Sequence, residues 1–134
     1  MRHVLFFILA AACVPAAGQT MEPGEWEFRT VTTSSMIPAP QTDTRVQCVS
    51  PEDARDPTRF TSRNEIAGCS ITPGELSAGT FEWTVQCQQG LRGTGKAIIA
   101  GATIEGEMRM NVDLQGVKME ITAQTRGRRL GPCK

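Results

Sequence analysis

The chain has 134 residues, with 14 basic and 14 acidic side chains and a single histidine. This length predicts one domain. The balanced charge argues against binding to nucleic acid or to an anionic membrane surface, because both depend on an excess of Lys and Arg.

Residues 1–18 have the pattern of a cleaved export signal. A short basic start precedes an apolar run at residues 4–14, which is too short to cross a bilayer, and then small residues at 16–18. We therefore expect a mature β domain at residues 19–134 without a transmembrane segment. Cys13 lies in a poor match to a lipoprotein processing site, so we do not expect a lipid anchor there.

Export removes His3 and Cys13 and leaves four cysteines, Cys48, Cys69, Cys87 and Cys133. An even number of cysteines in a small exported protein predicts two disulfides, for which three connectivities exist. The mature chain would contain no imidazole base, no Ser–His or Cys–His pair and no histidine-containing zinc site. The cysteines also form no C-x-x-C motif. We expect no catalytic residue, no metal and no cofactor.

The first predicted elements are two strands. Residues 25–33 form a strand with Trp26 and Phe28 on one face, and residues 42–49 form a second strand that carries Val46 and Cys48 on one face. The prolines between these strands predict a break or a hairpin loop.

One short helix is predicted near residues 51–56. Ser50 is a suitable N-cap and Pro51 suits the first helical position. Pro57 ends the helix, and Phe60 is expected to fold back as an apolar plug.

Residues 69–87 predict a β-hairpin that turns about Ala78. Apolar and polar residues alternate strictly over residues 81–87. Pairing the two strands about a turn at Ala78 places Cys69 opposite Cys87, close enough for a disulfide. The alternative is two separate buried thiols. If the hairpin pair forms, Cys48 must pair with Cys133.

The remaining chain continues as antiparallel strands joined by short turns. Trp83 lies opposite Gly95 in this register, and residues 104–114 and 117–123 alternate so that their apolar faces agree. We expect an all-β antiparallel meander of about seven to eight strands. Glycines favour strong curvature, so we predict an open barrel or half-barrel rather than a sandwich; they are Gly93, Gly95, Gly101 and Gly106.

A predicted concave apolar face supplies the candidate ligand-facing residues, which are Trp26, Phe28, Trp83, Met108, Met110 and Met119. Three of these methionines, with Met36, would also suit a copper(I) site, since thioether sulfur is a soft ligand. We interpret them as core residues, because methionine commonly fills irregular core space.

Charged residues supply a second group of candidates. Arg126, Arg128 and Arg129 form a basic cluster that would bind an anionic group or would only make the C-terminal tail soluble. The outward-facing glutamates alternate with basic residues, which predicts cross-strand salt bridges and not the paired carboxylates of a hydrolase; they are Glu105, Glu107 and Glu120.

Several short motifs in order resemble the DUF3617 family of small exported proteobacterial proteins of unknown function. They are PGEWEF (23–28), CVSPEDA (48–54), FEWTVQC (81–87), GEMRM (106–110) and GRRLGPC (127–133). The resemblance covers residues 21–133 and implies a periplasmic protein with paired cysteines. It implies no activity, because none is established for the family.

Two functions follow as expectations. The first is a non-enzymatic binding module for a small apolar or amphipathic ligand or a peptide segment. The alternative is a structural or stress-related cell-envelope protein that contacts other proteins through a sheet edge or the basic end.

Overall fold

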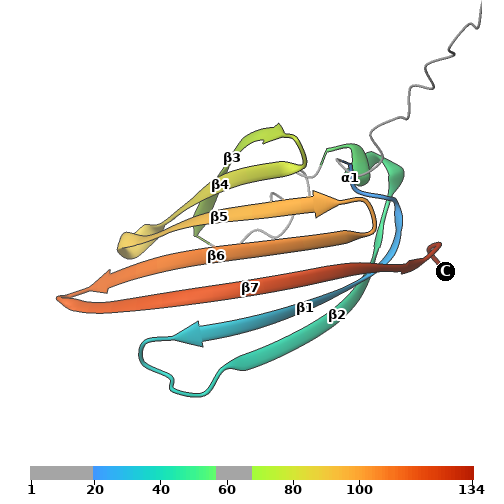
Figure 1. The fold of residues 1–134 in the computed structure, drawn as a ribbon. Helices are drawn as coiled ribbons and strands as arrows, with labels where there is room; N and C mark the ends of the chain where they lie inside the picture. Colours follow the sequence, from blue (N-terminus) through green and yellow to red (C-terminus); the bar gives the residue numbers. More distant parts are fainter. Residues whose placement is uncertain (1–19, 57–67) are drawn as a thin grey trace, which may run out of the picture.

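The computed structural model describes residues 20–56 and 68–134, which form one antiparallel sheet (Figure 1). Its strands are β1 (Gly24–Ser34), β2 (Gln41–Val49), β3 (Cys69–Ser77), β4 (Thr80–Cys87), β5 (Leu91–Ala100), β6 (Thr103–Leu114) and β7 (Val117–Gly131). In the described residues a short helix, α1 (Pro51–Arg55), follows β2, and a 3-10 turn, η1 (Gln88–Gly90), joins β4 to β5. Within the described ranges no helix is long and apolar enough to cross a membrane.

Three predictions concern residues outside the described ranges. These are the export signal at residues 1–18, the absence of a lipid anchor at Cys13, and the plug at Phe60. They stay predictions.

The strand order is β2-β1-β7-β6-β5-β4-β3. Strands β3 to β7 form the predicted meander. Trp83 lies opposite Gly95, and the apolar faces of β6 and β7 agree, as predicted. Cys69 also lies opposite Cys87, but the register shifts between Pro73 and Leu76, so the β3–β4 hairpin turns at residues 78–79 and not symmetrically about Ala78. The meander does not extend to the whole sheet, because consecutive strands β2 and β3 lie on opposite edges. The reason is that β7 continues to Gly131, past the predicted end at residue 123, and pairs along β1.

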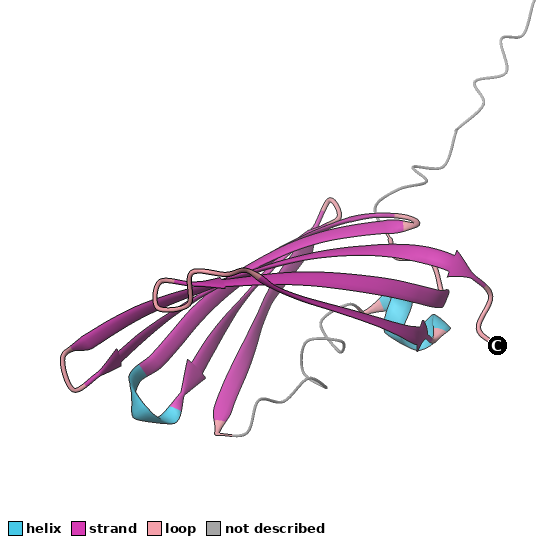
Figure 2. Ribbon diagram, turned by 90° about the horizontal axis from the view of Figure 1, so that it is seen from below, coloured by secondary structure: helices cyan, strands magenta, loops and turns pink. Residues whose placement is uncertain are grey.

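The prediction of an open barrel or half-barrel is wrong. The sheet stays open, with β2 and β3 as its two edges (Figures 1 and 2). Strong curvature requires bulges or bends that interrupt the pairing. Gly93, Gly95 and Gly106 instead lie in unbroken register between β5 and its neighbours, and Gly101 lies in the β5–β6 turn.

Gly95 has a packing role. A Cβ built on Gly95 would lie within 2.0 Å of Cε2 of Trp83, so the indole ring covers this glycine directly. The predicted pair of an aromatic residue over a cross-strand glycine is confirmed. The glycine therefore creates space for Trp83 and does not bend the strand.

The helix α1 is short but well capped. Oγ of Ser50 accepts a hydrogen bond from the amide of Asp53 at 3.1 Å, as the sequence predicted. Ala54 of the helix is buried in the main apolar cluster. The other members of that cluster are Met21, Trp26, Phe28, Val49, Phe81, Ala97 and Ile99. The core thus lies where α1 and the chain before β1 meet one face of the sheet.

A disulfide bond is attached to each edge strand of the sheet. Cys69 is bonded to Cys87 within the β3–β4 hairpin, and Cys48 at the end of β2 is bonded to Cys133 beyond β7. These are the pairs that the hairpin register predicts.

Candidate functional site

The sheet has an apolar face and a polar face, because alternate residues of each strand point to opposite sides. On β5 the odd-numbered residues 93–99 are buried and the even-numbered residues 92–100 are exposed. The pairing register carries this division onto the neighbouring strands.

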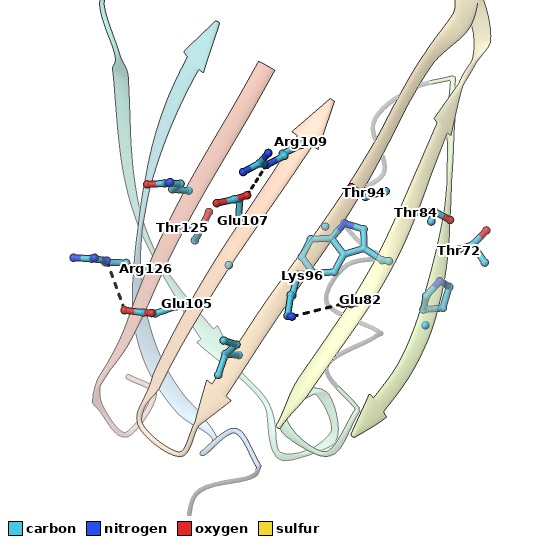
Figure 3. Close-up of a pocket in the computed structure, with 17 residues that line it drawn as sticks. Thr72, Glu82, Thr84, Thr94, Lys96, Glu105, Glu107, Arg109, Thr125 and Arg126 are labelled. Carbon is cyan, nitrogen blue, oxygen red and sulfur yellow. Dashed lines mark hydrogen bonds and ion pairs between the residues drawn. The ribbon is translucent and has the colours of Figure 1, made fainter. Parts of the chain in front are cut away.

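A groove with a volume of about 920 Å³ lies over β3 to β7 (Figure 3). Most of the side chains that line it belong to the polar face. Lys96 and Ile98 on β5, and Glu105, Glu107 and Arg109 on β6, are among them.

Threonines form a row across one half of the groove. Thr72 on β3 lies opposite Thr84 on β4, and Thr84 lies opposite Thr94 on β5. The row continues with Arg109 on β6. Each threonine offers both a hydroxyl, which donates and accepts hydrogen bonds, and a methyl group. The row is therefore suited to contact a ligand that has polar and apolar parts.

Three ion pairs lie on the same face of the sheet as this row. The Nζ of Lys96 lies 3.7 Å from Oε1 of Glu82, the Nε of Arg126 lies 3.7 Å from Oε1 of Glu105, and the third pair joins Arg109 and Glu107 on β6. The two cross-strand pairs follow the predicted pattern of a solvated face. Exposed pairs of this kind contribute little to stability, so they remain available to a ligand.

The Arg109–Glu107 pair is the shortest of the three, with 2.6 Å between Nε and Oε1. The hydrogen bond from Arg109 and its positive charge lower the pKa of Glu107 below its ordinary value and raise the pKa of Arg109. Glu107 therefore stays ionised to a lower pH than an ordinary glutamate. The groove carries equal numbers of acidic and basic lining residues, which makes it charge-balanced.

The predicted ligand-facing residues lie on the other face. Trp26 is fully buried, and Phe28 and Met110 are also buried, so these three belong to the packed interior. Met108 and Met119 are half-buried on strands β6 and β7. The structure brings the six residues onto one face, but only Trp83 also lines the groove.

Met36 lies apart from the three methionines on the apolar face of β6 and β7. Met36 lies in the β1–β2 loop with 62% of its surface exposed, whereas Met110 is buried within the sheet. Among residues 20–56 and 68–134 there is also no group of three or more His, Cys, Asp or Glu side chains that could hold a metal ion.

The predicted basic cluster is divided among three partners. Arg126 pairs with Glu105 and Arg128 pairs with Glu27, both on the polar face. Arg129 instead donates from Nε to the backbone oxygen of Pro23 at 2.8 Å. The three arginines are close together in the sequence, but in the structure their side chains contact different partners and do not converge on one site.

Sequence reasoning missed the threonine row and Lys96 as groove residues. The signal was present, because all of them occupy outward positions in strands whose alternation was recognised. Those positions were assigned to solvent, since nothing in the sequence shows which face of an open twisted sheet is hollow.

Comparison with known proteins adds one result. Neither a search of curated proteins nor a search of solved structures found a match. The family model of DUF3617, a protein family of unknown function, matches residues 21–133, which is nearly the whole described sheet and its core. The chain belongs to the DUF3617 family.

Proposed function

We propose that this protein is a non-enzymatic binding module whose polar-face groove takes an amphipathic ligand or a peptide segment. The observation that carries the proposal is the open groove of about 920 Å³ on β3 to β7. This volume lies within the range of about 300–1,000 Å³ that is typical of ligand sites.

The lining supports an amphipathic ligand rather than a purely apolar one. Ile98 on β5 is half-exposed on the polar face and adds apolar surface beside the methyl groups of the threonine row. Threonine hydroxyls and ion pairs surround these apolar groups. A ligand with an apolar part and polar groups would satisfy both kinds of surface.

The balance of charge in the groove limits the class of ligand further. Each basic residue of the groove has a glutamate beside it, so a polyanion would meet as much repulsion as attraction. A zwitterionic or neutral molecule, or a short extended peptide with charges of both signs, suits this surface. Such a peptide would replace the existing ion pairs with its own.

We also infer that the protein acts in the periplasm. Two features support this location. The first 18 residues have the pattern of an export signal, and the two disulfides need an oxidising compartment to persist.

The test is an NMR titration of the disulfide-bonded protein with two probes, a zwitterionic detergent below its micelle concentration and a short peptide of alternating Lys and Glu. We expect saturable shifts of amide signals at Thr84, Thr94 and Lys96. The variant Thr94→Trp fills the groove and should abolish them.

Thr33→Trp is the matched control, because Thr33 is exposed on the polar face of β1 but does not line the groove. Binding should survive this change. Shifts centred on Met108 and Met119 would move the site to the apolar face and overturn the proposal. The absence of saturable shifts with both probes would also overturn it.

A further inference from the structure

The edge strand β2 is regular and exposed. Its pairing with β1 is unbroken from Gly24 opposite Val49 to Thr32 opposite Gln41, and the strand contains no proline. No described strand pairs with its outer side. An exposed edge strand presents a row of unpaired backbone groups and is a template for pairing with another chain.

The side chains of β2 carry a self-complementary charge pattern. Asp43 and Arg45 lie two residues apart and therefore share a face of the sheet, with Thr44 between them. Both are exposed, and neither forms an ion pair with another described residue. Opposite charges on each side of one residue are complementary to a second copy of the same strand in antiparallel orientation.

We propose that β2 pairs antiparallel with β2 of a second copy of this chain, about a twofold axis at Thr44. Asp43 then lies opposite Arg45 of the second copy, and the symmetry repeats this ion pair. Thr42 lies opposite Val46, which is 52% exposed in the single chain and gains a β-branched neighbour. The two sheets become one continuous sheet with both apolar faces on the same side.

Other registers are less favourable. A shift by one residue would place the apolar face of one copy beside the polar face of the other. A shift by two residues would place Asp43 opposite Asp43, or Arg45 opposite Arg45, and like charges directly opposite each other destabilise a sheet. The register centred on Thr44 is the one that pairs opposite charges and keeps the faces aligned.

The geometry also limits the assembly to two copies. A twofold contact uses the same strand of both chains and so closes on itself. The outer edges of the dimer would be the two β3 strands, where Pro73 removes a hydrogen-bond donor and the register shifts between Pro73 and Leu76. Further growth stops there. The contact does not involve the groove, which lies over β3 to β7.

The first test is analytical ultracentrifugation of the disulfide-bonded protein from about 10 µM to 1 mM. We expect a weak dimer, because one pair of strands buries little surface, and we expect it to weaken in high salt. The variants Asp43→Arg and Arg45→Asp should each raise the dissociation constant about tenfold or more. The double variant Asp43→Arg/Arg45→Asp restores opposite charges and should restore the dimer.

Asp113→Arg is the matched control. It makes the same change of charge near the β6–β7 turn, where Asp113 lies opposite Lys118, and it should leave the dimer unchanged. A protein that is monomeric at every concentration overturns the proposal. So does a double variant that associates no better than the single variants.

The second test fixes the register. Residues directly opposite in an antiparallel pair have Cα atoms about 4.5–5.5 Å apart, which suits a disulfide. Thr44→Cys meets its own copy at the twofold axis and should form a cross-linked dimer under mild oxidation. Thr42→Cys faces Val46 and should not. Equal cross-linking of both variants, or none at Thr44→Cys, would contradict this register.

Discussion

The two edge strands of this sheet differ in a way that their similar lengths do not suggest. Both β2 and β3 have nine residues, and each is held at one end by a disulfide. In β3 the pairing is interrupted between Pro73 and Leu76, whereas in β2 it runs without a break. The interruption disfavours pairing of β3 with another chain, whereas the regular backbone of β2 remains suited to such pairing.

The disulfides at the two edges also differ in the length of chain between the bonded cysteines. Cys69–Cys87 joins neighbouring strands across a separation of 18 residues, while Cys48–Cys133 spans 85 residues. The first holds the end of the β3–β4 hairpin that lies beyond its register shift. The second joins the end of β2 to the end of the chain, and so it supports the long-range pairing of β1 with β7.

The largest expected effect is the loss of the long disulfide. The variant Cys48→Ser/Cys133→Ser should lower the free energy of unfolding by about 4–5 kcal/mol, because a long loop is freed in the unfolded chain. Urea denaturation followed by tryptophan fluorescence measures this. A loss below about 1 kcal/mol would show that pairing with β7 holds the β1–β2 hairpin without the covalent tie.

Loss of the short disulfide should lower the free energy of unfolding by a smaller amount. For Cys69→Ser/Cys87→Ser we expect about 3 kcal/mol in the same measurement, because the freed loop is shorter. The order of the two effects is the sharper result, since it depends only on loop length. If the hairpin variant were the less stable one, the β3 edge would depend on its disulfide more than loop length predicts.

A third prediction concerns the interruption in β3. A Cβ at Gly74 would lie 2.5 Å from the backbone oxygen of Glu82, which cannot move without breaking the strand pairing. Gly74→Ala should therefore cost about 1–3 kcal/mol.

Gly131→Ala is the control for this change, because nothing lies within 4 Å of a Cβ at that position. It should alter the free energy of unfolding by less than about 0.5 kcal/mol. Equal effects at both positions would mean that the close approach at Gly74 relaxes freely.

The smallest effect on stability is expected from the Arg109–Glu107 pair, which lies on the polar face between the two edges. Because Arg109 lowers the pKa of Glu107, the folded protein should bind a proton there at lower pH than the unfolded chain does. Its small contribution to stability is present above the unfolded pKa and is lost as the pH falls through the folded pKa. Carbon-detected NMR titration of the Glu107 carboxyl should give a midpoint below that of an ordinary glutamate.

Arg109→Gln removes both the hydrogen bond and the charge, so the midpoint should rise toward the ordinary value. An unchanged Glu107 midpoint in the variant would remove Arg109 as the cause of the shift.

Local signals were enough to predict much of this fold. Turn length and strict alternation predicted the pairing of Trp83 with Gly95 and the agreement of the apolar faces of β6 and β7. They also predicted Cys69 opposite Cys87, a pairing that the structure reaches through the register shift in β3. The cap at Ser50 was also readable, because a helix N-terminus depends on adjacent residues. The groove could not be predicted in this way, since its lining comes from five strands.

The sequence by itself determined an all-β domain, the register of the hairpins from β4 to β7, its two disulfides and its family. These features depend on residues that are close along the chain or on counting cysteines. Only the tertiary structure decided that β7 pairs with β1, that the sheet stays open, and that the groove lies on the polar face. Those outcomes depend on contacts between distant segments and on the shape of the whole sheet, which no local pattern of residues encodes.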